Sequence, residues 1–207
     1  MKPLASTLGS LALIALLNAG CVTNVPYPNG RPVQVLNPDD AGFVRGTGIE
    51  SQDLVAVADK MARGILGADP IRNAAASPYV ILDPVTNNTR FPINQDIFLR
   101  SIRVRLNEQA AGRVIFLARD RMETLERERA WKQEGRVLSS TDPHVNEFRG
   151  ADYVLTGNLD GLSASSSQGM SDYILYSFQL IDANTSALVW ESYAEVKKQG
   201  LTDAVYR

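Results

Sequence analysis

Residues 172–182 read DYILYSFQLID, and this alternating stretch decides the fold class of the chain. Successive side chains of a strand point to opposite faces, so every second position of the stretch packs on one face. Those positions hold Ile174, Tyr176, Phe178 and Leu180. A large apolar row of this kind predicts a strand with one face buried in the core.

Two further runs flank this stretch and have the same character. Residues 151–162 read ADYVLTGNLDGL, and residues 188–198 read LVWESYAEVKK, in which Glu191 and Glu195 alternate with buried-type residues. The connections between the three runs are polar, and residues 163–171 (SASSSQGMS) are expected to form a flexible hairpin loop. Neighbouring strands joined by such loops predict an antiparallel meander at the carboxyl end of the domain.

Helices and short strands alternate upstream of the meander. Apolar residues recur at helical spacing in residues 51–67, with Ser51 as the expected N-cap, and in residues 95–112, with Asn94 as the cap. Residues 77–85 and 113–119 are short apolar runs that predict strands. Residues 86–94 (TNNTRFPIN) are expected to form a polar loop.

A charged helix is predicted after the second of these strands. It begins at Asp120, which forms an expected capping box with Glu123, and continues through residues 121–135 with Glu–Arg and Glu–Lys pairs four residues apart. Residues 141–150 (TDPHVNEFRG) predict a short additional helix. The whole order predicts a mixed α+β (α/β) domain with a single mixed sheet of about four to five strands flanked by helices.

The first residues read as an export signal rather than a membrane span. The run LALIALLNAGCV, residues 11–22, is shorter than the roughly 20 apolar residues that cross a bilayer. Small residues precede Cys21, the one cysteine of the chain, as in a bacterial lipobox, although Asn18 stands where Leu is usual. A plain signal peptide followed by a chance cysteine is the alternative interpretation.

We therefore divide the chain into a signal peptide of residues 1–20, a lipidated cysteine with a Pro-containing tether over 21–48, and a globular domain over 49–207. The lipid on Cys21 gives an exported protein a use for an unpaired cysteine. Val22 follows the cysteine where inner-membrane lipoproteins carry Asp, so resemblance to bacterial lipoproteins implies the outer membrane, facing the periplasm.

Composition argues against several classes of activity. The net charge is −2, with 21 Lys and Arg against 23 Asp and Glu, so there is no general attraction for nucleic acid. The chain has one histidine, His144, and one cysteine, which argues against a zinc site or a Cys–His nucleophile. No phosphate-binding or nucleophile-elbow motif is present. We expect no enzyme activity, no small-molecule substrate and no cofactor apart from the covalent lipid.

Two kinds of site are considered. A hydrolase would need two of the acidic residues Asp152, Asp160 and Asp172 to converge, which their separate strands make improbable. A protein-docking surface is favoured around the TNNTR loop and the following helix, because Arg is enriched at interface hot spots. The predicted partner-binding residues are Asn88, Thr89, Arg90, Arg100 and Arg103. A solvated basic face is the alternative.

Several motifs resemble the LpoB family of outer-membrane lipoproteins, over about residues 50–200. The resemblance is carried by NNTR (87–90), by GADYVLTGNLDG (150–161) and by the closing QLIDANTSALVWESYAEVKKQG (179–200). Some of these motifs recur in TolB-like amino-terminal domains. The resemblance implies a non-catalytic protein whose domain binds and activates a bifunctional penicillin-binding protein, the enzyme that synthesises peptidoglycan.

Two features depart from that family. The tether is short, and the charged helix of residues 121–136 has no counterpart. A second function therefore stays open, that of a structural or assembly lipoprotein in an envelope or curli-type secretion complex.

Overall fold

The computed structural model describes residues 33, 35–40, 42, 45–138 and 148–201. Its contacts divide the chain into Met1–Val35 and Leu36–Arg207, and every element described below belongs to the second unit. The predicted signal peptide and Cys21 lie outside the described residues, as do His144 and most of the short helix predicted over 141–150. Residues 148–150, at the end of that prediction, are not helical.

One mixed sheet of six strands organises the unit, which confirms the predicted fold class. The strands are β1 (Tyr79–Leu82), β2 (Thr86–Asn88), β3 (Ile115–Phe116), β4 (Tyr153–Ser166), β5 (Gly169–Asp182) and β6 (Leu188–Gly200). Their order is β3-β1-β4-β5-β6, and β2 also pairs with β4. β1 pairs in parallel with β3 and with β4, and β2 pairs in parallel with β4, whereas β4, β5 and β6 form the predicted antiparallel meander.

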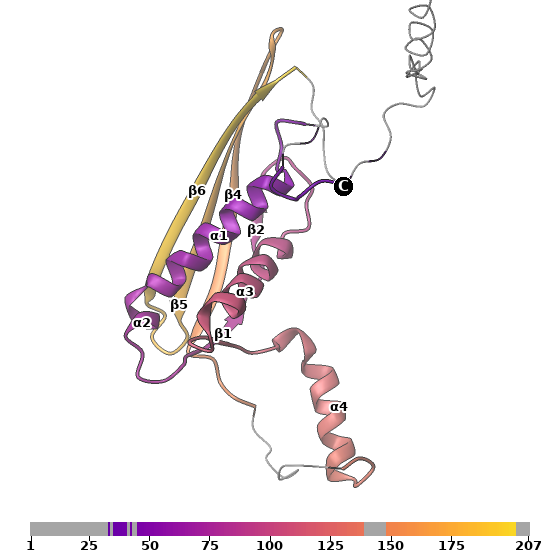
Figure 1. Cartoon of the computed structure of the whole chain (residues 1–207), viewed down its shortest axis with the longest axis vertical. Helices are drawn as coiled ribbons and strands as arrows, with labels where there is room; N and C mark the ends of the chain where they lie inside the picture. Colours follow the sequence, from indigo (N-terminus) through magenta and orange to yellow (C-terminus); the bar gives the residue numbers. More distant parts are fainter. Residues whose placement is uncertain (1–32, 34, 41, 43–44, 139–147, 202–207) are drawn as a thin grey trace, which may run out of the picture. The chain divides into compact units, whose positions relative to one another are not determined.

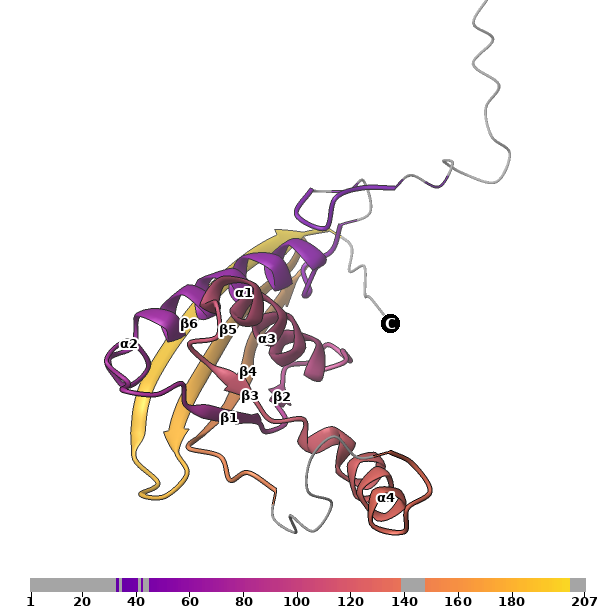
Figure 2. The ribbon, with the colours of Figure 1, turned by 60° about the horizontal axis from the view of Figure 1, so that its bottom comes forward.

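Two long helices cover one face of this sheet. α1 (Ser51–Gly67) and α3 (Asp96–Ala110) lie side by side over it, with the short α2 (Asp69–Arg72) after α1 (Figures 1 and 2). The predicted apolar row of β5 faces them, and Phe98 of α3 stacks at 5.4 Å from Tyr176 and 6.4 Å from Phe178. In β4, β5 and β6, the more polar residues of each alternating pattern lie on the opposite face of the sheet.

The N-caps differ from the prediction. α1 is capped by Glu50, whose backbone N–H donates to Asp53 Oδ2 at 2.8 Å, rather than by Ser51. α3 begins after Gln95, and Asn94 takes part through its backbone carbonyl, which accepts from the Ile97 N–H at 3.2 Å. In both helices the N-cap is one residue away from the residue that side-chain preference predicted.

Two predicted loops are strands. β2 occupies the start of the TNNTR loop, because its backbone pairs in parallel with Asn158–Asp160 of β4 and needs no apolar side chain. The predicted hairpin loop 163–171 is also mostly strand: β4 and β5 stay paired until Ser166 and Gly169, leaving a two-residue turn. Gly169 has a φ of 139°, and a Cβ there would lie 2.5 Å from the Gly200 carbonyl oxygen.

The charged insertion between β3 and β4 forms η1 (Arg119–Arg121) and α4 (Met122–Gln133). The predicted capping box is wrong, since the N-cap is Arg121 and no side chain bonds to the helix end. The predicted pairs Glu123–Arg127, at 2.9 Å, and Glu128–Lys132, at 3.8 Å, are present. No residue of α4 is buried, so the helix adds surface to the domain rather than core.

Among the described residues, the side chains of Tyr176 and Arg105 each have a buried polar atom without a hydrogen-bond partner, and that of Tyr176 lies in the core. The Tyr176 side chain is fully buried, and its hydroxyl makes no hydrogen bond with the described part of the chain. Burial of this hydroxyl raises the pKa of Tyr176, with a smaller contribution from the Asp53 carboxylate. A buried hydroxyl without a partner costs about 1–3 kcal/mol of desolvation.

Replacing Tyr176 by Phe removes that hydroxyl and keeps the ring contacts with Phe98. We expect Tyr176→Phe to raise the free energy of unfolding by about 1 kcal/mol, measured from the urea midpoint at unchanged slope. The matched control is Tyr173→Phe, because the Tyr173 hydroxyl donates to Glu195 at 2.8 Å on the other face and its loss gives no gain. A clear destabilisation by Tyr176→Phe would show that the hydroxyl has a partner.

Candidate functional site

A group of charged and polar side chains, named here the polar clamp, closes the apolar face of the sheet at the end near the N-terminus of α1. It consists of Arg90, Asp172, Ser163, Lys198 and Asp53. Ser163, Asp172 and Lys198 are direct neighbours on β4, β5 and β6. They continue the same row of positions that holds Ile174 and Tyr176, so the covered face changes from apolar to charged there.

Arg90 and Asp172 form the first half of the clamp. Arg90 Nε donates to Asp172 Oδ1 at 2.9 Å and Nη2 donates to Oδ2 at 2.7 Å, a bidentate pair in which the carboxylate side chain is 1% exposed and the guanidinium side chain 32%. Arg90 above all holds the pKa of the Asp172 carboxyl well below its usual range, against the effect of burial and with help from the hydroxyls of Ser163 and Thr47.

Lys198 forms the second half. Its Nζ donates to Asp53 Oδ2 at 2.6 Å and to the Gly48 carbonyl oxygen at 2.9 Å, and lies 3.4 Å from Glu50 Oε2. Thr47 and Glu50 are themselves buried. The clamp therefore attaches the segment that leads into α1 to the end of β6.

The predicted partner-binding residues separate into two groups. Asn88 donates to Asp160 Oδ1 at 2.8 Å, the Thr89 hydroxyl donates to Asn87 Oδ1 at 2.7 Å, and Arg90 belongs to the polar clamp. The contacts of Asn88 and Arg90 attach the β2 region to β4 and β5, whereas that of Thr89 stays within the β2 region. The role of these three residues in partner binding stays a prediction. Arg100 and Arg103 lie on α3, in a different surface feature.

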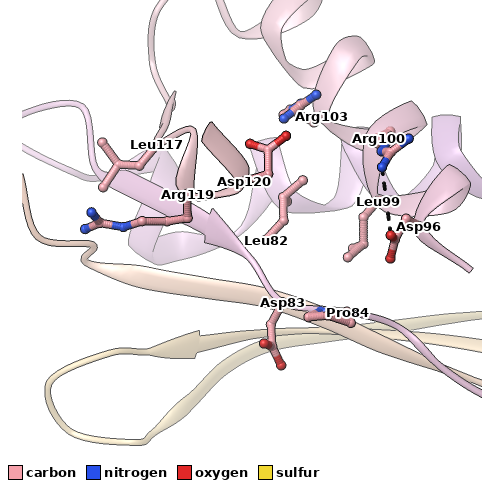
Figure 3. A pocket seen from close by; sticks show the side chains of 10 residues that line it. All are labelled: Leu82, Asp83, Pro84, Asp96, Leu99, Arg100, Arg103, Leu117, Arg119 and Asp120. Carbon is pink, nitrogen blue, oxygen red and sulfur yellow. Dashed lines mark ion pairs between the residues drawn. The ribbon is translucent and has the colours of Figure 1, made fainter. Parts of the chain in front are cut away.

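That feature is a pocket of about 150 Å³ where β1 and β3 end beside α3 (Figure 3). Leu82, Leu99 and Leu117 give it an apolar floor. The charged lining comes from the residue after β1, from α3 and from the segment after β3: Asp83, Asp96, Arg100, Arg103, Arg119 and Asp120. The carboxyl ends of parallel strands are where open α/β sheets commonly hold their binding sites.

The charged side chains of this pocket differ in whether they already have a hydrogen-bond or ion-pair partner. Asp96 and Arg100 face each other at 3.9 Å (Figure 3). Arg119 donates to the Arg149 carbonyl oxygen. Asp120 lies 3.6 Å from Arg121. By contrast, Arg103 makes no hydrogen bond or ion pair with any residue that the structure describes. It is a half-buried guanidinium with its donors still available.

Exposed apolar side chains border the pocket on α3. Ile97 is 44% and Val104 49% exposed, and both lie on the same helix face as Arg100, three to four residues apart. We name the group Asp96, Ile97, Arg100, Arg103 and Val104 the α3 surface. Exposed apolar side chains together with arginines, one of them with available donors, are typical of a protein-docking surface.

The acidic residues considered for hydrolysis do not converge. Asp160 accepts from Asn88 on the uncovered face of the sheet, whereas Asp172 lies in the polar clamp on the covered face. Asp152 accepts from the Tyr79 backbone N–H at 2.8 Å, before β4 begins. In the described part of the chain no three metal-ligating side chains gather into a possible metal site, and no helix there is long and apolar enough to cross a membrane.

The family model of the peptidoglycan-synthase activator LpoB matches residues 53–196, from the first turn of α1 to Val196 within β6. The chain belongs to the LpoB family. Proteins of the LpoB family are activators of peptidoglycan synthases rather than enzymes. The match includes both the polar clamp, except for Lys198, and the α3 surface.

Solved structures of LpoB and of another lipoprotein resemble the chain at low identity. The LpoB C-terminal domain from Salmonella enterica is 17% identical over 70% of this chain and 98% of that chain, with a TM-score of 0.43. That from Escherichia coli is 18% identical over 70% and 98%, with a TM-score of 0.40. Lipoprotein GNA1162 from Neisseria meningitidis is 17% identical over 59% and 83%, with a TM-score of 0.37. No curated protein sequence matches the chain.

Sequence reasoning missed the polar clamp, although a signal for it is present. Asp172 and Lys198 occupy the same alternating positions as the buried residues of their strands, and a charge at such a position requires a partner. The partner of Asp172 is 82 residues away at Arg90, a distance over which no local pattern gives guidance.

Because of the polar clamp, we expect the free energy of unfolding of this LpoB-family domain to fall at acid pH. Because the folded pKa of Asp172 is depressed, its contribution is present above the unfolded value near 4 and is lost as the pH falls toward the folded pKa. We expect Asp172→Asn to lower the free energy of unfolding by about 2 kcal/mol at pH 7. The loss should shrink below about pH 4, where the wild-type curve falls and the variant's is flatter.

Urea unfolding between pH 2 and pH 7 measures this difference. Asp160→Asn is the matched control, since it removes a carboxylate on the uncovered face and should change the unfolding free energy by less than about 0.5 kcal/mol. A difference between wild type and Asp172→Asn that stays constant with pH would contradict the account of the clamp.

Proposed function

We propose that the chain is a lipid-anchored lipoprotein of the outer membrane that binds a bifunctional penicillin-binding protein in the periplasm and stimulates its synthesis of peptidoglycan. The observation that carries the proposal is the match to the synthase-activator family over residues 53–196. That range includes both covering helices and nearly the whole sheet, so the likeness concerns the folded unit rather than a short motif.

Stimulation without catalysis requires a preference for one state of the partner. A binding protein changes the activity of an enzyme only by binding its active conformation more tightly than its inactive one. A coupling free energy of about 1–3 kcal/mol corresponds to a 5- to 150-fold change in affinity between the two states. The chain therefore needs a rigid docking surface rather than an active site.

The α3 surface is the best candidate for that docking surface. α3 is held from below by Phe98 and Leu106, which are fully buried, so its outer side is presented in a fixed orientation. Arg103 lines the pocket with available donors, and the exposed Ile97 and Val104 lie with Arg100 on a neighbouring face of the same helix. A partner surface with a carboxylate beside apolar side chains matches this arrangement.

Assembly of an envelope or secretion complex is the other function that the sequence left open. The family match favours the activator, because the description of that family is synthase activation.

Reversing the charge of Arg103 tests the role of the α3 surface. We expect Arg103→Glu to weaken binding of the solubilised synthase by the full-length lipoprotein at least about tenfold, and to remove its stimulation of glycan polymerisation. Arg63→Glu is the control: it makes the same charge change on the outer side of α1, where Arg63 is 64% exposed. Equal behaviour of the two variants, both folded by circular dichroism, would contradict docking through α3.

Replacing Cys21 tests the anchor separately. We expect Cys21→Ser to abolish incorporation of a labelled fatty acid and to move the protein from the membrane fraction to the soluble fraction. Two or more acyl chains are needed for a stable anchor, so no intermediate distribution is expected. Labelling that persists in the variant would contradict lipid attachment at this position.

A further inference from the structure

β6 is a long strand at an open edge of the sheet. It pairs with β5 on one side, and in the described residues no strand pairs with its other side. Proteins usually protect such an edge by keeping the strand short, by placing Pro or a bulge in it, by charged side chains, or by covering it with a helix or loop, and of these β6 has charged side chains. β6 has 13 residues and no Pro, and its one register irregularity lies near its beginning, opposite Leu180 and Ile181.

The direction of the unpaired backbone groups follows from the hairpin between β4 and β5. Its two-residue turn makes Ser166 and Gly169 the last hydrogen-bonded pair, so even-numbered residues of β5 direct their backbone groups toward β6. Those residues face even-numbered residues of β6, which leaves the odd-numbered ones pointing to the open edge. In agreement, the Tyr193 carbonyl oxygen accepts from Lys60 Nζ at 2.6 Å.

The side chains along this edge carry a charge pattern that is complementary to itself. Exposed positions of β6 read Glu191, Tyr193, Glu195 and Lys197, and Ala194 is the midpoint of the strand. An antiparallel copy of β6 centred on Ala194 places Glu191 opposite Lys197 of that copy, and does so twice by symmetry. Shifting the centre by one residue brings Glu191 against Glu195, or Glu195 against itself.

We propose that β6 pairs antiparallel with β6 of a second copy of this chain, about a two-fold axis at Ala194, so that the two sheets become continuous. This centre pairs the strand over its full length, whereas a centre two residues away leaves part of it unpaired. Val196 and Ala194 line a groove of about 480 Å³ between β6 and α1, which receives the side chains of the incoming strand.

Lys60 restrains this association. Its ammonium group must leave the Tyr193 carbonyl oxygen, which in the pair accepts from the backbone N–H of the partner's Glu195. Lys60 is an exposed residue of α1 whose Nζ also lies 5.3 Å from the centre of the Tyr193 ring. Removal of the side chain by Lys60→Ala is therefore expected to increase the dimer fraction.

A disulfide at the two-fold axis gives the direct test. Opposite residues of a pair without mutual hydrogen bonds have Cα atoms about 4.5 Å apart, within the range that a disulfide bridges. We expect Ala194→Cys in the full-length chain, in its native membrane, to form a disulfide-linked dimer on mild oxidation. Wild type, whose one cysteine is Cys21, measures any background crosslinking.

Ser192→Cys and Val196→Cys are the matched controls on the same face of β6. In the proposed register each is about 14 Å from its own copy, beyond the reach of a disulfide. Crosslinking through residue 192 or 196 in preference to 194 would overturn the register. Absence of crosslinking at all three positions, with a monomer in sedimentation at high concentration, would overturn the interface.

A charge exchange tests the complementarity independently. We expect Glu191→Lys and Lys197→Glu each to weaken dimer formation about tenfold, because each creates two like-charge contacts. The double variant Glu191→Lys/Lys197→Glu restores opposite charges and should return dimer formation to near the wild-type level. Failure of the double variant to recover would contradict the pairing. These measurements involve no synthase, so their outcome is separate from that of the activator proposal.

Discussion

The bidentate pair between Arg90 and Asp172 is the interaction on which the arrangement of the domain depends. Asp172 stands in a strand position that is otherwise apolar, so its charge must be compensated within the covered face. The compensation comes from the loop after β2, which precedes α3. Lys198 on the neighbouring strand is in turn paired with Asp53 at the start of α1. One row of charged residues thus fixes where the segment before α3 and the start of α1 contact the sheet.

This constraint connects the fold to the proposed function. With its entry fixed by Arg90 and its inner side packed through Phe98, α3 presents Arg100, Arg103 and the exposed apolar residues beside them as a rigid surface. The chain belongs to a family of peptidoglycan-synthase activators, and the docking role proposed for this surface rests on that membership. The acidic residues of the domain instead serve its architecture, as the contacts of Asp152, Asp160 and Asp172 show.

Local sequence patterns predicted the parts of the fold that hydrophobic periodicity determines. The alternation of β5 and β6 and the helical spacing in α1 and α3 identified the correct elements, because each buries one apolar face. β2 was assigned to a loop because its pairing with β4 is made by backbone groups. The partner of Asp172 was missed because ion pairs between distant segments leave no local pattern. The guanidinium of Arg90 binds Asp172, and its expected role in docking stays a prediction.

Hydrogen–deuterium exchange on the full-length lipoprotein, alone and with the solubilised bifunctional synthase, tests most directly whether the activator docks through α3. The account expects slower exchange on binding in residues 96–104 and in 117–120, which form the pocket and its border. It expects little change in the open edge of β6. Protection confined to β6 or to the uncovered face of the sheet, with α3 unchanged, would contradict the proposed docking surface.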